Sequence, residues 1–222
     1  VLTAAAVALL LASTPGYSAS EEQAQAAPQK VSAPGELVRL GYNDVGQVVL
    51  GYRMANDSVG EEWLLLEVGM TLIKGVDAVQ MTRESLIVET PDGRRVPLAT
   101  QEEYSNAYQA LKKMDKRANY VRDSIDYLPA SATTPCAMSL FSDTGGKSRK
   151  RARDGFELSW RTRCFGRVYF HVPGGIQYGQ HFLDVQLGES TVRVPFRIMT
   201  KEELKEAKAE YKRMKKEAKQ AK

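Results

Sequence analysis

The fold is decided by the stretch from Phe156 to Ile198, which reads FELSWRTRCFGRVYFHVPGGIQYGQHFLDVQLGESTVRVPFRI. Apolar and polar residues alternate along it in successive runs, and a turn signal separates each run from the next. A period of two places the apolar residues on one face of a pleated strand, and a second layer must cover that face. The pattern therefore predicts antiparallel strands packed in a sandwich or barrel. The apolar residues of these runs are Phe156, Leu158, Trp160, Cys164, Val168, Phe170, Leu183, Val185, Leu187, Val192, Val194, Phe196 and Ile198.

The chain before this stretch carries further strand signals and one helical signal. Residues 63–73 are apolar on both sides, which is typical of a central strand. The Asp-Gly pair at 92–93 stands between two apolar runs and predicts a β-hairpin. From Thr100 to Lys116 the apolar period becomes helical, and Thr100 forms a capping box with Glu103. We expect this amphipathic helix to pack on the strands.

Together these signals predict a mainly β fold. We expect one antiparallel β-sandwich, immunoglobulin-like in general shape and built of roughly seven to nine strands. The expected domain covers residues 35–199, with the packed helix inserted at about 100–116. A charged helix over residues 200–222 follows it and opens with another capping box. Pro195 lies inside the last strand and predicts either an edge position or a missing ladder bond, because proline has no N–H to donate.

The first residues indicate export. Residues 1–12 form an almost unbroken apolar run, and residues 13–20 are small and polar, as in the cleavage region of a signal peptide. We therefore expect a signal peptide over 1–20, truncated at its front because methionine and a charged leader are missing, and a flexible linker over 21–34. A buried N-terminal helix is the alternative. The apolar run is shorter than the roughly 20 residues of a membrane-spanning helix, so we expect no transmembrane span in the mature chain.

The two cysteines agree with export. Cys136 and Cys164 make an even pair in a chain that we expect to reach an oxidising compartment, and we predict a disulfide between them. Their spacing is not that of a redox or zinc motif. The alternative is a pair of reduced, buried thiols. We expect a periplasmic or secreted protein in a bacterial host.

Charge is nearly balanced overall but is clustered in two places. The formal net charge is +4, which by itself does not indicate a nucleic-acid partner. From Tyr211 to the end, six Lys or Arg face one Glu. We predict contact with an anionic partner, such as an envelope component or another envelope protein, and the alternative is a solvated loop and helix. The absence of interleaved aromatic residues argues against nucleic acid. The candidate partner-binding residues are Lys147, Arg149, Lys150, Arg151, Arg153, Lys212, Arg213, Lys215 and Lys216.

The only two histidines, His171 and His181, flank a glycine-rich loop over residues 173–180. If the flanking strands pair as a hairpin, the imidazoles approach each other, but the residues have opposite parity and would point to opposite faces. We therefore predict no metal site there. Loops on rigid sheets often carry function, so the candidate ligand contacts are Gln177, Tyr178, His171 and His181, although a plain hairpin loop is the simpler interpretation.

Three functional hypotheses follow. The first is a non-enzymatic envelope protein that binds an anionic partner through the basic loop at residues 147–153 and the basic C-terminal helix. The second is a protein–protein assembly module that uses a sheet edge or the C-terminal helix. The third is a module for small ligands or carbohydrates, or an enzyme, centred on the loop at 173–180. No GxSxG or HExxH motif is present, which lowers the expectation of an enzyme and of any cofactor.

Overall fold

The computed structural model describes residues 29–142 and 152–220. These residues form twelve strands, four α-helices and one short 3-10 helix, η1 (Arg83–Ser85). With 41% strand against 24% helix, the prediction of a mainly β fold is confirmed. The predicted count of roughly seven to nine strands is too low, and neither a sandwich nor an immunoglobulin-like shape is established. The predicted signal peptide and residues 21–28 of the predicted linker lie outside the described residues.

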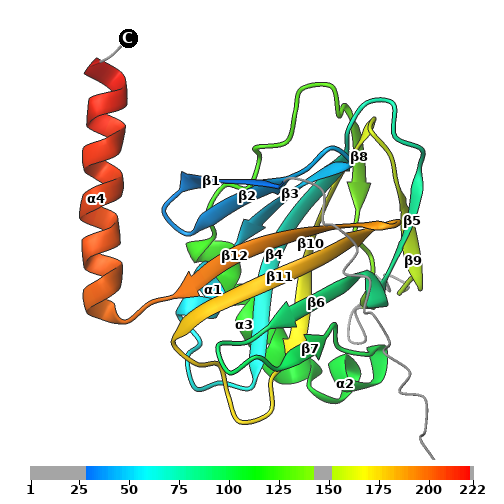
Figure 1. Cartoon of the computed structure of the whole chain (residues 1–222). Coiled ribbons are helices and arrows are strands. Elements are labelled where there is room, and N and C mark those ends of the chain that lie inside the picture. Colours follow the sequence, from blue (N-terminus) through cyan, green and yellow to red (C-terminus); the bar gives the residue numbers. More distant parts are fainter. Residues whose placement is uncertain (1–28, 143–151, 221–222) are drawn as a thin grey trace, which may run out of the picture.

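The larger sheet has six strands in the order β1-β2-β3-β4-β10-β8 (Figure 1). They are β1 (Lys30–Gly35), β2 (Val38–Tyr42), β3 (Gly46–Gly51), β4 (Trp63–Leu72), β10 (Thr162–His171) and β8 (Thr134–Ala137). Neighbours are antiparallel except β8 and β10, which run parallel. This pair at the edge is the parallel exception in an otherwise antiparallel sheet.

The second sheet has four strands in the order β12-β11-β6-β7. They are β12 (Ser190–Ile198), β11 (Gly179–Leu187), β6 (Leu86–Glu89) and β7 (Arg95–Pro97). The hairpin predicted at 92–93 joins β6 to β7, and Gly93 takes the positive φ of 81° that such a turn needs. β12 is an edge strand, as Pro195 predicted. A separate pair joins β5 (Val79–Thr82) to β9 (Gly155–Leu158).

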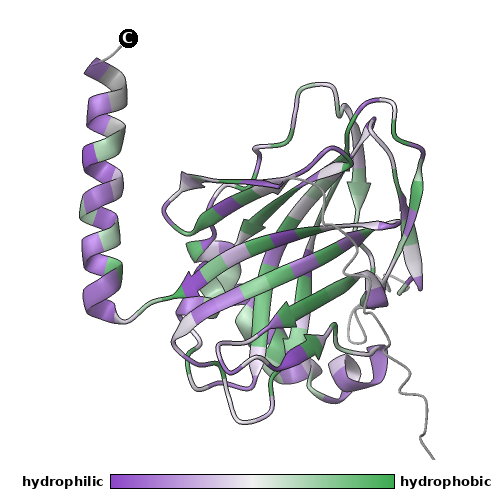
Figure 2. Ribbon diagram, viewed as in Figure 1, coloured by the Kyte–Doolittle hydropathy of each residue, from purple (hydrophilic) through white to green (hydrophobic). Residues whose placement is uncertain are grey.

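One apolar core lies between the two larger sheets. Leu66 on β4, Leu183 on β11 and Val194 on β12 are each fully buried in it. The alternating residues that decided the fold are all buried except Trp160, which is half-buried. The approach of the sheets is close, since a Cβ atom on Gly41 of β2 would lie 2.9 Å from a methyl group of Val194. In Figure 2 the apolar colour accordingly follows the strands, whereas the C-terminal helix is mainly hydrophilic.

A second, smaller core lies on the outer face of the six-stranded sheet. It is covered by α1 (Arg53–Asn56), α2 (Gln101–Asn106) and α3 (Tyr108–Val121). The helix predicted at about 100–116 is thus two helices that meet at Ala107, and the second continues to Val121 because Ala118 is still buried against the sheet. The predicted capping box is confirmed: the Glu103 N–H donates to Thr100 Oγ1 at 3.1 Å, and the Thr100 N–H donates to Glu103 Oε2 at 2.7 Å.

The predicted linker over 21–34 is wrong for its last residues, because β1 begins at Lys30. Lys30 pairs with Tyr42 and Ser32 pairs with Leu40, so the backbone ladder with β2 orders this segment. Its side chains are mostly exposed, which explains why no apolar period marked it as a strand. Among the helices of residues 29–142 and 152–220, none combines the length and the hydrophobicity that crossing a bilayer requires.

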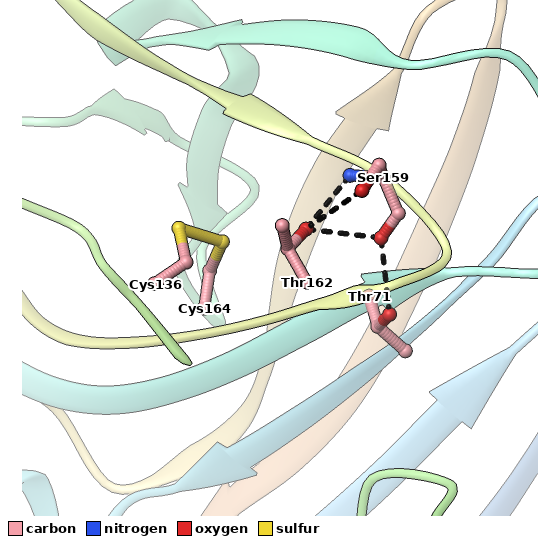
Figure 3. The surroundings of a disulfide bond; sticks show 5 residues. All are labelled: Thr71, Cys136, Ser159, Thr162 and Cys164. Atoms are coloured by element: carbon pink, nitrogen blue, oxygen red, sulfur yellow. Dashed lines mark hydrogen bonds between the residues drawn. A yellow bond between two sulfur atoms is a disulfide. The ribbon is translucent and has the colours of Figure 1, made fainter. Parts of the chain in front are cut away.

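The predicted disulfide between Cys136 and Cys164 is confirmed. The two cysteines are register partners on the parallel strands β8 and β10, so the bond ties the short edge strand to its only neighbour in the sheet. Figure 3 shows the adjoining turn from β9 to β10. There the Ser159 N–H donates to Thr162 Oγ1 at 2.8 Å, and Thr71 Oγ1 donates to the Ser159 carbonyl at 3.3 Å. These bonds anchor the start of β10 beside the disulfide.

Candidate functional site

Figure 1 shows α4 (Lys201–Gln220) following β12 at one side of the domain, and side-chain contacts anchor the first half of this helix. Its predicted capping box is confirmed, since the Thr200 N–H donates to Glu203 Oε2 at 2.9 Å. Leu204 and Ala207 pack against the main core. Lys208 Nζ lies 3.5 Å from Glu36 Oε1. Tyr211 Oη, the last of these contacts along the helix, donates to the Pro34 carbonyl at 3.0 Å.

The second half of α4 projects beyond these contacts. Met214 is 49% exposed, so the thin apolar stripe of the helix no longer meets the domain there. Lys212, Arg213 and Lys216 are exposed, and in the described parts of the chain no carboxylate lies within ion-pair distance of them. The side chain of Lys215 lies outside what the structure describes. Three of the predicted partner-binding cations therefore share one solvated helical end, which we call the basic arm (residues 212–220).

The other predicted basic cluster falls mostly outside the described residues. Lys147, Arg149, Lys150 and Arg151 belong to that part of the chain. Arg153 is described and exposed, and its N–H donates to the Ser139 carbonyl at 2.8 Å. Arg153 therefore lies beside the segment that follows β8.

The two histidines do not come together, and the hairpin considered for them is wrong. β10 and β11 belong to different sheets, so the strands that flank the glycine-rich loop do not pair. His171 stacks on Trp63 with 5.0 Å between ring centroids. His181 is 1% exposed and stacks on Phe196 at 5.2 Å. Within the described ranges, no group of three or more His, Cys, Asp or Glu side chains is arranged to hold a metal ion.

Burial of His181 predicts a pH dependence of stability. Burial lowers the pKa of this imidazole, while the bond from its Nδ1 to the Gly179 carbonyl, at 3.1 Å, opposes the shift. The imidazole of His181 therefore binds a proton less readily in the folded state than in the unfolded state, where its ordinary pKa is about 6.5. We expect the free energy of unfolding to fall as pH drops from about 7.5 to about 5.5, by at most about 1.4 kcal/mol per pH unit.

The measurement is urea unfolding across that pH range for the wild type and for His181→Gln. The variant is expected to be less stable at neutral pH, because it loses the stacking on Phe196. Its stability should nevertheless depend less on pH than that of the wild type. Equal slopes for the two proteins would show that His181 does not exclude its proton in the folded state.

The glycine-rich loop exposes Tyr178, which is 51% accessible, and Gln177. Neither residue lines the cavity of about 390 Å³ or the cleft of about 920 Å³ that the described residues form. A shallow cavity of about 390 Å³ does lie beside the loop's first residues and is lined by His171, Pro173 and residues 94–97 among others. Of the four candidate ligand contacts predicted there, only His171 borders it.

A second, larger cleft was not predicted from the sequence. It has a volume of about 920 Å³ and lies on the outer face of the six-stranded sheet. Its floor is β10, and its walls are α3, residues 122–126 and residues 137–141. None of the predicted site residues lines it. Phe165, Arg167 and Tyr169 alternate with the core residues of β10, so they point to the opposite face of the sheet. These large side chains were the sequence signal that could have indicated a packed outer face.

An ion network occupies the centre of this cleft. Arg167 Nη2 lies 3.2 Å from Glu67 Oε1, and Arg167 Nη1 lies 3.1 Å from Asp115 Oδ1. Arg167 also donates to Asn119 Oδ1 at 2.7 Å, and Tyr169 Oη donates to Asp115 Oδ1 at 2.6 Å. Burial raises the pKa of Glu67 against the opposing effect of Arg167. Burial and then Asp115 raise the pKa of Tyr169 far above its ordinary value, so its hydroxyl remains a neutral donor.

Comparison with known proteins assigns no family. Searches against protein-family models, curated proteins and solved structures found no match to this chain. The function is therefore inferred from the contacts, the burial and the charges of its own residues.

Proposed function

We propose that this chain is an exported, non-enzymatic envelope protein that binds an anionic partner or surface through the basic arm of α4. The observation that carries the proposal is the exposure of Lys212, Arg213 and Lys216 on the helical end that follows the anchoring contact of Tyr211. A cluster of cations without internal partners attracts anions from solution, and each Lys or Arg near an anionic surface contributes about 1 kcal/mol.

The position of the arm supports this interpretation. The anchored half of α4 mixes acidic and basic residues, whereas the half after Tyr211 carries five Lys or Arg against one Glu. The anchor at Leu204, Ala207 and Tyr211 holds the basic end away from the sheets, so that it can approach a surface without the domain intervening. The proposal includes the basic segment over 147–153 as a second contact, on the evidence of its sequence. The disulfide agrees with a periplasmic or secreted location.

The test is the binding of the full chain to vesicles of phosphatidylglycerol and of phosphatidylcholine, and to a soluble polyanion such as heparin. Replacing Lys212, Arg213 and Lys216 with Gln should weaken anion binding by about 100-fold, or about 3 kcal/mol. Wild-type binding should also fall as salt rises from about 0.1 M to about 1 M.

A matched variant keeps this test specific. Lys30, Lys113 and Lys116 are exposed lysines outside α4, and replacing all three with Gln removes the same charge. This control should bind anionic vesicles and heparin almost as well as the wild type. If the two triple variants lose affinity equally, the effect belongs to net charge and the proposal for the arm is refuted.

An assembly module that uses a sheet edge is the second candidate, since β12 is an edge strand. That edge is partly satisfied within the chain. The Arg193 N–H donates to Gln29 Oε1 at 2.6 Å, and Gln29 Nε2 donates to the Arg193 carbonyl. Pro195 lies two residues further, on the same open side, where it supplies no N–H. The edge therefore offers little for strand addition, which favours the basic arm.

A further inference from the structure

The cleft beside α3 has the size of a small-molecule site. Its volume of about 920 Å³ falls within the usual range of roughly 300–1,000 Å³ for ligand pockets. It lies on a different element from the basic arm, and the function proposed above makes no use of it.

Two glycines make the floor of this cleft flat and apolar. A Cβ atom on Gly69 would lie 2.5 Å from the ring of Phe165, so only glycine lets that ring lie on β4. A Cβ atom on Gly166 would likewise lie 2.7 Å from Met138 Cβ. Phe165 and Phe141 are only partly buried and both line the cleft. The floor can therefore pack against a planar apolar group.

Each acidic group of the cleft is already paired with an arginine inside the protein. Arg167 holds Glu67 and Asp115, as described above. Asp126 is paired with Arg163. Asp123 accepts two hydrogen bonds from Arg53, at 2.9 and 2.8 Å. A cationic ligand would have to compete with these arginines for each carboxylate.

Two basic groups of the lining are not neutralised in this way. Lys112 and Arg122 are exposed, and no carboxylate in the described ranges lies within ion-pair distance of either one. Lys112 Nζ lies 5.7 Å from the centroid of the Tyr108 ring, so it sits at the aromatic wall. Arg122 lies near Glu67, and its charge lowers the pKa of that carboxyl group. Lys112 and Arg122 are therefore the cations of the lining that an anion could approach without displacing an ion pair.

From these features we infer that the cleft binds a small organic anion: a carboxylate, phosphate or sulfonate attached to a planar apolar body. The apolar body packs on Phe165 and Phe141, and the anionic group faces Lys112 and Arg122. The carboxylates held by arginine exclude cations of the same shape.

The test uses a pair of probes with one apolar body and opposite charges, naphthoate and naphthylmethylammonium, with acetate as the anion that lacks the ring. Amide NMR spectra of the full chain are recorded during each titration. Naphthoate should shift the amides of residues 138–141 and 165–167 and bind roughly tenfold more tightly than the ammonium probe, a difference of about 1.4 kcal/mol. Acetate at the same concentration should cause no comparable shifts.

Variants assign the preference to the two basic residues. Replacing Lys112 and Arg122 with Gln should abolish the preference for naphthoate and leave the spectrum of the folded core unchanged. Replacing Lys113 and Lys116 with Gln removes the same charge from α3 outside the cleft lining and should preserve the preference. The triple variant of the basic arm should bind naphthoate as the wild type does, so the two proposals fail independently.

Three results would overturn the inference. They are no saturable shifts at the cleft amides, equal affinity for the two charged probes, and a preference for naphthoate that survives in the Lys112→Gln, Arg122→Gln protein.

Discussion

Replacing Cys136 and Cys164 with alanine should lower the free energy of unfolding by about 3–4 kcal/mol. The bridge joins residues 28 positions apart, and its removal restores conformational freedom to the unfolded chain. The native state also depends on it, because β8 has four residues that are mostly exposed and pairs only with β10. Chemical denaturation of the oxidised wild type and the double variant measures the difference.

Two controls define this result. The free energy of unfolding of the wild type in excess reductant should agree with that of the double variant to within about 1 kcal/mol. Hydrogen exchange should accelerate more at Thr134 and at residues 136–137 of β8 than in the central strand β4. An unchanged unfolding midpoint would mean that β8 is held by its other contacts and that the bridge is dispensable.

Replacing Arg167 with methionine should cost about 3 kcal/mol, because it leaves Glu67 and Asp115 without their cation. Glu67 is only 12% exposed, so water cannot replace the lost ion pair fully. Arg163→Met is the matched control: its partner Asp126 is 64% exposed, and the loss should be at most about 1 kcal/mol. Thermal and urea unfolding of both variants provide the comparison.

The origin of this loss can be separated by pH and by a second substitution. Burial already raises the pKa of Glu67, so the folded protein favours the protonated carboxyl group. Burying the Glu67 carboxylate costs free energy at neutral pH. This cost falls as pH drops through the raised pKa of the folded state, and it is gone below the ordinary pKa of the unfolded state. The deficit of Arg167→Met relative to wild type should therefore shrink on acidification. Adding Glu67→Gln should recover part of it at neutral pH. A deficit independent of pH would assign the loss to packing.

The main core was predictable because its signal is local. Alternation in β10, β11 and β12 identified the buried parity correctly, from Val168 to Ile198. The capping boxes at Thr100 and Thr200 and the turn at Gly93 also depend on residues a few positions apart. Each of these features is set by neighbours in sequence, and each was confirmed.

Features that depend on distant pairing were not predictable. β1 has exposed side chains and exists because β2 supplies its ladder, so no apolar period marked Lys30 to Pro34. Nothing local shows that β8 runs parallel to β10, or that β10 and β11 join different sheets. The break at Ala107 likewise follows from how α2 and α3 meet the sheet.

The cleft illustrates the same limit. Its central ion pair joins Glu67 to Arg167, which are 100 positions apart and become neighbours through the register of β4 with β10. Lys112 and Arg122 reach the site only because α3 crosses this face of the sheet. The basic arm, in contrast, was visible as a run of charge, and the structure adds its anchoring at Tyr211 and the exposure that follows.

The most direct test of the proposed function compares the full chain with a chain that ends at Tyr211 in a pulldown from the native envelope fraction, at low and at high salt. The shorter chain keeps the anchoring contacts of α4 at Leu204, Lys208 and Tyr211 and loses only the basic arm. The proposal predicts a partner that the full chain retains at about 0.1 M salt, that about 1 M salt releases, and that the shorter chain does not capture. A partner that remains bound at high salt, or that both chains capture equally, would contradict the proposal.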